Sequence, residues 1–262
     1  MLDGLTSKRL LESLIVNHEL NIVFQPIFNS SKNTIWGYEA LTRLPEQHPI
    51  SSPTVLFALA EKCGYLSQIE LYCRKLAIQR FSELKLEGLL FLNVSPLTIA
   101  QKSHPHGETL NLLKQNGLTP EQVVIEVTEQ YEAEDPSLLK ESLEYYRNSG
   151  FSIAIDDLGT GHSGLKQWAE IQPDIVKIDR YFISGCPSNV VKRELLRTIF
   201  ELGKTTGAAI IAEGIEEFEE YELLNSLGMV YAQGYLLAKP QAQPVRAFPE
   251  LIKHYNKVSL RA

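Results

Sequence analysis

The sequence has few cysteines, no long hydrophobic run and no excess of positive charge. Its 262 residues include only Cys63, Cys73 and Cys186, which form no Cys-x-x-Cys pair. A small domain held together by disulfides is therefore excluded, and a reducing compartment is expected. No apolar stretch reaches the roughly 20 residues that a membrane helix needs, and charges such as Asp3 and Lys8 interrupt any signal-peptide core. We expect a cytoplasmic protein with no membrane segment.

Acidic residues outnumber basic ones. The chain has 25 lysines and arginines against 32 aspartates and glutamates, which gives a formal net charge of −7. A nucleic-acid polymer is therefore an unfavourable partner. A small anionic ligand is still compatible with this charge, because a metal ion bound among carboxylates reverses the local sign.

Short β-rich runs alternate with longer helical patterns from one end of the chain to the other. The eight runs are 22–28, 34–43, 89–95, 123–129, 152–157, 174–179, 208–214 and 231–238, and helical spacing is clearest in 137–148, 190–206 and 216–227. This order predicts an α/β fold, a TIM-like (β/α)8 barrel of mostly parallel strands covered by helices. The short gap between the first two runs favours a hairpin, which places one antiparallel strand near the N-terminus. Without a linker of any length, residues 1–262 are expected to form a single domain with its core at about 20–245.

Polar residues stand late in strands that are otherwise apolar. Any one of them has an ordinary structural explanation, such as a helix cap or a buried ion pair. In a barrel, however, the active site lies at the C-terminal ends of the strands, which favours a chemical role for the set. Its members are Glu39, Arg43, Asn93, Glu126, Glu129, Asp156, Asp157, Lys177, Asp179, Glu213 and Gln233.

The carboxylates in this set indicate a metal site. Five carboxylates around one mouth cannot all stay ionised without cations. Oxygen ligands without histidine or cysteine favour Mg²⁺ or Mn²⁺ over zinc. Asp156 and Asp157 point to opposite sides of an ideal strand, but a turn into Gly159 can direct both to one site. That arrangement suits two ions sharing a ligand, as in phosphate-ester hydrolysis, whereas the alternative for the Asp-Asp pair is a turn with a helix cap.

The motifs together resemble a known family. Residues 38–43 read YEALTR and carry a Glu-Ala-Leu signature, and seven further blocks, one before it and six after it, agree in order and spacing over about residues 20–245. They are FQPIF, LNVSP, IEVTE, AIDDLGTGHSGL, VKIDRYFI, AEGIE and QGYLLAKP. In these blocks the chain resembles the EAL domain of bacterial cyclic di-GMP phosphodiesterases.

This resemblance implies a barrel with an antiparallel strand and hydrolysis of cyclic di-GMP to linear pGpG without a covalent intermediate. It implies two divalent cations, Mg²⁺ or Mn²⁺, held by Glu39, Asn93, Glu126, Asp156, Asp157 and Glu213. Lys177 resembles the lysine that holds and activates the attacking water, and Glu39, Glu213 and Gln233 are expected to share in catalysis. Arg43, Gln25, Asp179 and Gln233 are expected to contact the substrate, and Glu129 to anchor the loop after Asp157.

Two alternative functions would differ from the enzyme in the residues that they retain. A silent receptor that binds cyclic di-GMP and acts through a protein partner would usually have lost ligands, and none is lost here. A scaffold that binds no nucleotide would predict decay of Arg43, Asn93 and Gln233, which is not seen. We also expect a homodimer, with regulation by dimerisation, by a partner or by a domain outside this sequence.

Overall fold

The computed structural model describes residues 4–100, 106–128, 136–161, 164–250 and 252–253, and its strands close into a barrel in chain order. The strands are β1 (Asn21–Asn29), β2 (Thr34–Arg43), β3 (Leu89–Asn93), β4 (Val123–Thr128), β5 (Ser152–Leu158), β6 (Ile175–Ile178), β7 (Ala209–Ala212) and β8 (Tyr231–Ala232). The predicted α/β barrel is confirmed.

Strand β1 is the antiparallel member of the barrel. It runs antiparallel to both neighbours, β2 and β8, whereas the other neighbouring pairs are parallel. Residue Asn21 pairs with Arg43 and Asn29 with Thr34, so residues 30–33 close a hairpin. Asn33 takes a φ of 53° there, in the left-handed region that asparagine tolerates. The predicted hairpin is therefore confirmed.

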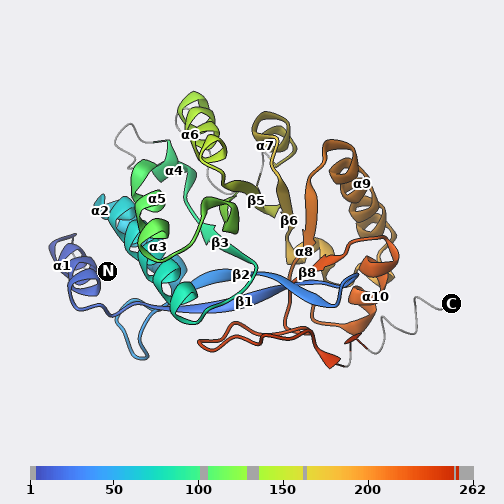
Figure 1. Cartoon of the computed structure of the whole chain (residues 1–262), viewed down its shortest axis with the longest axis horizontal. Helices are drawn as coiled ribbons and strands as arrows, with labels where there is room; N and C mark the ends of the chain where they lie inside the picture. Colours follow the sequence, from blue (N-terminus) through green and yellow to red (C-terminus); the bar gives the residue numbers. More distant parts are fainter. Residues whose placement is uncertain (1–3, 101–105, 129–135, 162–163, 251, 254–262) are drawn as a thin grey trace.

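The helices lie around the outside of the strands (Figure 1). They are α1 (Gly4–Val16), α2 (Pro53–Cys63), α3 (Leu66–Glu83), α4 (Pro96–Ile99), α5 (His106–Gln115), α6 (Pro136–Asn148), α7 (Gly164–Ile171), α8 (Arg180–Ile183), α9 (Val190–Thr206) and α10 (Phe218–Ser226), with 3-10 turns η1 (Pro120–Gln122) and η2 (Cys186–Ser188). Helix α9 matches its predicted range, because Asn189 caps its start and Gly207 ends it at a φ of 80°.

Apolar packing fixes the barrel from both sides. The main core lies between strands and helices, and a second cluster that includes Leu11, Leu14, Leu56 and Ile69 joins α1, α2 and α3. A third cluster combines one residue from each of six strands: Ile27, Phe91, Val124, Ala154, Ile175 and Ile211. This last layer fills the inside of the barrel with apolar side chains.

The last strand is shorter than predicted. The sequence predicts a strand over 231–238, but β8 ends at Ala232. Gly234 lies so close to the backbone of Ile215 that a Cβ would stand 2.1 Å from the Ile215 oxygen, and the chain turns there. The following segment passes along β1, where Phe24 and Gln241 form an isolated antiparallel bridge (Figure 1).

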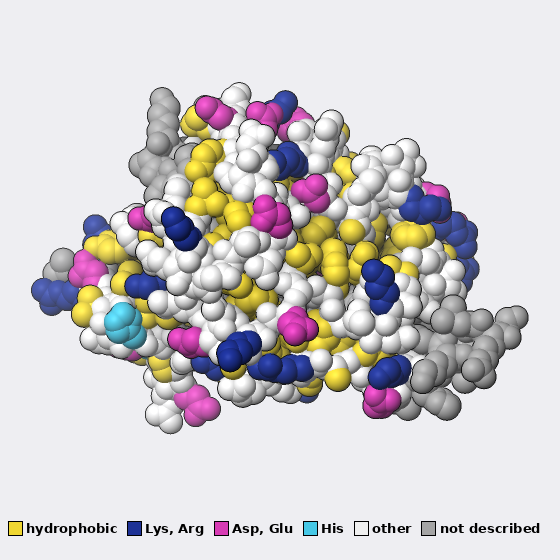
Figure 2. Space-filling view, viewed as in Figure 1, with side chains coloured by type: hydrophobic (Ala, Val, Ile, Leu, Met, Phe, Trp, Pro, Cys, Tyr) yellow, Lys and Arg dark blue, Asp and Glu magenta, His cyan; other side chains and the backbone are white. Residues whose placement is uncertain are grey.

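The surface carries charges of both signs. On the face shown in Figure 2, acidic and basic side chains are interspersed among apolar ones over the helices. Among the described residues, no helix is both long enough and apolar enough to cross a membrane.

Candidate active site

The polar site is the second layer of the barrel interior. Side chains two residues apart on a strand share a face, so the residues two positions beyond the apolar layer also point inward. On β3 this places Asn93 after Phe91, and on β6 it places Lys177 after Ile175. Counting two residues on from the apolar layer also gives Glu126 on β4, Asp156 on β5 and Glu213 directly after β7. Strand β1 runs in the opposite direction, so there the inward-facing polar residue is Gln25, two positions before Ile27.

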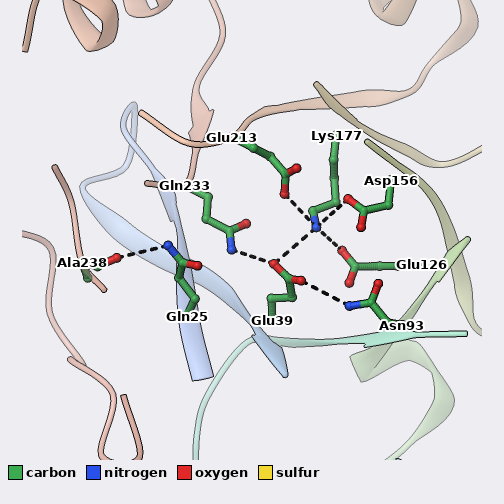
Figure 3. Close-up of polar contacts among 9 residues, drawn as sticks. All are labelled: Gln25, Glu39, Asn93, Glu126, Asp156, Lys177, Glu213, Gln233 and Ala238. Atoms are coloured by element: carbon green, nitrogen blue, oxygen red, sulfur yellow. Dashed lines mark hydrogen bonds and ion pairs between the residues drawn. The ribbon is translucent and has the colours of Figure 1, made fainter. Parts of the chain in front are cut away.

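Lys177 lies at the centre of this layer (Figure 3). Its side chain is 1% exposed. The distances from its Nζ to carboxylate oxygens are 2.7 Å to Glu126, 2.7 Å to Glu213, 2.9 Å to Asp156 and 3.4 Å to Glu39. One buried ammonium group thus faces four carboxylates, and its single positive charge cannot neutralise them all.

Glu39 joins the lysine to two amides (Figure 3). Asn93 Nδ2 donates to Glu39 Oε1 at 3.2 Å, and Gln233 Nε2 donates to Glu39 Oε2 at 2.7 Å. Gln25, which pairs with Glu39 across β1 and β2, donates to the carbonyl of Ala238 at 3.3 Å. The bonds from Asn93 and Gln233 fix the Glu39 carboxylate from both sides.

A bulge brings Asp156 and Asp157 to one site. The register between β5 and β6 shifts between Ile155 and Leu158, and Asp157 takes a φ of 56°. A bulge re-aims the side chains of a strand, which is how consecutive residues can face the same cavity. Oxygens of Asp156, Asp157 and Glu213 lie within 4.8 Å of one another, which is the convergence that the sequence predicted.

Crowding and burial disfavour ionised carboxylates here. Burial raises the pKa of Glu126 and of Glu213 well above the usual range, although the charge of Lys177 opposes it. The pKa of Asp157 rises to about 6, because of burial first and then the charge of Asp156. Burial would lower the pKa of Lys177, but the surrounding carboxylates outweigh it and raise that pKa well above its usual value.

The donor set fits hard divalent cations. Two groups of convergent carboxylates share Asp156: one with Glu39 and Glu126, and the other with Asp157 and Glu213. In addition, Glu126 Oε2 is buried and accepts no hydrogen bond within the described part of the chain. Oxygen donors of this kind suit Mg²⁺ or Mn²⁺, and a shared carboxylate suits two ions.

Two adjoining cavities open on this layer. One of about 450 Å³ is lined by Lys177, Glu213, Gln233, Gln25 and Asp179 among others. Asp179 also caps α8 by accepting the Tyr181 N–H at 2.8 Å.

The second cavity, of about 330 Å³, contains Arg43 and shares Leu41, Asn93, Asp156 and Asp157 with the first. The Arg43 guanidinium donates to the carbonyl of Thr42 at 2.9 Å. The structure thus brings together every predicted site residue except Glu129, which lies outside the described residues.

Some cavity residues were missed from the sequence. Glu70 and Arg74 of α3 line the cavity that contains Arg43, and both are buried. The sequence does contain a signal for Glu70, because it is a charged residue at helical spacing within the apolar stripe of Leu66, Cys73 and Ala77. Arg180 and Glu216, which pair at 2.5 Å, line the cavity around Lys177 and carried no such signal.

Comparison with known proteins identifies the family. The model of the family described as EAL domain matches residues 8–240. The chain belongs to the EAL domain family. This EAL chain is 34% identical over 229 residues to the "Probable cyclic di-GMP phosphodiesterase PdeI" of Escherichia coli (strain K12), covering 85% of the chain and 29% of that protein. It spans about a third of the length of the first curated relatives it matches.

Solved EAL structures have the same fold. A standalone EAL protein from Vibrio cholerae O395 in its c-di-GMP-bound form matches with a TM-score of 0.80 at 28% identity, covering 89% of this chain and 97% of that one. The manganese and cy-diGMP complex of Klebsiella pneumoniae BlrP1 at pH 9.0 matches with a TM-score of 0.78 at 29% identity, covering 85% of this chain and 56% of that one.

Proposed function

We propose that this EAL chain hydrolyses one phosphodiester bond of cyclic di-GMP and releases linear pGpG. The observation that carries the proposal is the layer of five carboxylates and one buried lysine at the C-terminal mouth of the barrel. The family match and the ligands named for the related structures support cyclic di-GMP as the substrate.

The proposed cofactors are two divalent cations, Mg²⁺ or Mn²⁺. The residues that would hold them are Glu39, Asn93, Glu126, Asp156, Asp157 and Glu213. When bound, such ions lower the pKa of water and stabilise charge on phosphate and leaving-group oxygens. The carboxylates that repel one another in the protein alone would then all be ionised and paired.

The remaining residues would orient the reactants. Lys177 lies at the centre of the layer, and its three N–H groups face the carboxylates there. When cations engage those carboxylates, one of these N–H groups can hold the attacking water by donating to its oxygen. The buried Oε1 of Gln233 accepts no hydrogen bond within the described residues and can accept a hydrogen bond from that water, while Nε2 holds Glu39. Arg43, in the adjoining cavity, is suited to a phosphate or guanine contact, and Gln25 and Asp179 to other polar contacts of the nucleotide.

The proposed reaction needs no covalent intermediate. Attack of water on phosphorus forms one P–O bond and breaks the bond to the ribose 3′ oxygen, which leaves with a proton. Among the described residues, the lining of the cavity around Lys177 contains no serine, cysteine or histidine that could act as a nucleophile.

The direct test is incubation of the chain with cyclic di-GMP and Mn²⁺ or Mg²⁺, with and without EDTA, followed by chromatography. Metal-dependent pGpG is the expected product. The variant Glu39→Gln should be inactive, and the matched control Glu201→Gln, on an exposed residue paired with Lys204, should remain active. Intact nucleotide that is bound, as measured by calorimetry, would instead establish the receptor function.

We propose that the chain also forms a homodimer and is regulated by a partner or a domain outside this sequence. Apolar side chains exposed on α9, including Val190, Val191 and Leu195, would be covered in such an assembly. Light scattering at increasing concentration tests the dimer. A cytoplasmic location stays a prediction from the three free cysteines.

A further inference from the structure

The backbone conformation of Asp157 needs support. A non-glycine residue with a φ of 56° is held in the left-handed region at a cost of roughly 1 kcal/mol. Such conformations persist where the surroundings determine them. The Thr160 amide and hydroxyl each donate to the Asp157 carbonyl at 3.1 Å and close the turn that follows the strand.

The aromatic ring of Phe182 lies against the loop at Gly159, two residues after Asp157. A Cβ built on Gly159, whose φ is 101°, would stand 2.1 Å from Cε2 and 2.8 Å from Cζ of Phe182. The ring of Phe182 therefore occupies the space next to the Gly159 backbone. With no side chain at this position, the loop after Asp157 can lie flat against the ring.

The short helix that carries the ring is anchored through several contacts. Helix α8 begins at the cap Asp179, whose carbonyl accepts the Phe182 N–H at 3.1 Å. Phe182 packs on the main core, and the next residue, Ile183, is fully buried. From α9, Lys192 Nζ donates to the Ser184 carbonyl at 2.7 Å and holds the end of α8.

The contact therefore joins two strands of the site. Phe182 is connected through α8 to β6, which carries Lys177, and Gly159 directly follows β5, which carries Asp156 and Asp157. A ring fixed to one strand limits how far the end of the other can move.

We propose that Phe182 is a positioning residue that holds Asp157 in the conformation in which its carboxylate reaches Asp156 and Glu213. It thereby sets the affinity of the site for a divalent cation, and this inference rests on the proposed metal-dependent function. Groups that orient metal ligands have large effects on affinity although they do not touch the metal.

Calorimetric titration of the EDTA-treated chain with Mn²⁺, without nucleotide, tests this role. Phe182→Ala should weaken Mn²⁺ binding on the order of tenfold or more, and Phe182→Leu should weaken it less. The matched control is Phe200→Ala, because a Cβ on Gly228 would stand 2.8 Å from the Phe200 ring in the same kind of contact. That control should lower the thermal midpoint and leave Mn²⁺ affinity unchanged.

A double-mutant cycle separates positioning from general destabilisation. If Phe182 acts through Asp157, adding Phe182→Ala to Asp157→Ala causes no further loss of Mn²⁺ affinity. An additive loss, or wild-type affinity in folded Phe182→Ala and Phe182→Leu, overturns the inference while the proposed function stands. A wild-type chain that binds no Mn²⁺ refutes the proposed metal-dependent function itself, and the inference with it.

Discussion

Replacement of Glu70 by glutamine tests the electrostatics of the cavity beside the metal site. The Glu70 side chain is 6% exposed, and its Oε1 accepts the Ser95 N–H at 3.0 Å. Burial raises its pKa to about 7, and Arg74, Thr98 and Ser95 oppose that rise only in part. Glutamine keeps the acceptor for Ser95 but carries no charge.

The sign of the effect follows from linkage. The carboxyl titrates near 4.5 when exposed and near 7 when buried, so between these two pH values the folded state holds a proton that the unfolded state has released. Stability from this group is complete below pH 4.5 and is lost as the pH rises to 7. The loss amounts to about 3 kcal/mol at pH 8.

Thermal unfolding of the wild type and Glu70→Gln at pH 5 and pH 8 measures this loss, because the difference between the two proteins isolates Glu70. At pH 8 the variant should be more stable by about 3 kcal/mol, or roughly 6–12 °C in thermal midpoint. At pH 5 the gain should fall below about 1 kcal/mol. A variant less stable than wild type at pH 8 would show that Arg74 stabilises the ionised carboxylate more than burial disfavours it, contrary to this prediction.

Three substitutions test other residues of the site and the barrel. Glu39→Gln should abolish turnover through weaker Mn²⁺ binding, and unchanged calorimetric affinity would contradict its role as a ligand. Lys177→Met should keep Mn²⁺ and nucleotide binding but lower kcat by orders of magnitude, and wild-type turnover would exclude a role for the lysine. Gly37→Ala should lower the free energy of unfolding by about 1–3 kcal/mol, because the alanine Cβ would stand 2.5 Å from the Leu89 carbonyl oxygen. Chemical denaturation measures this loss, and wild-type stability would refute the close packing at Gly37.

Polar residues that stand late in otherwise apolar strands predict most of the site. The C-terminal ends of barrel strands meet at one mouth, so such residues are expected to lie together. Asn93 after the apolar run 89–92 and Lys177 after Ile175 and Val176 can be recognised in this way from the sequence alone. The short connection after β1 likewise predicts the hairpin, because no parallel crossover fits in it.

Other features depend on tertiary contacts that local patterns do not contain. The end of β8 is set by Gly234 against the backbone of Ile215, a residue far away in sequence. The sequence predicts the turn that brings Asp157 to the site only as one of two alternatives. Nothing in the sequence indicates that the ring of Phe182 lies against Gly159. The apolar stripe of α3 marks Glu70 as a buried charge, but only the folded structure places it in the cavity that contains Arg43.

The carboxylates around Lys177 are proposed to bind two cations, with which the chain hydrolyses cyclic di-GMP. The most direct measurement is a titration of the metal-free chain with Mn²⁺ in which bound metal and pGpG are quantified in the same samples. We expect pGpG formation to rise as the second equivalent binds. Product formed without metal, or nucleotide left intact with two equivalents bound, would contradict the two-metal mechanism.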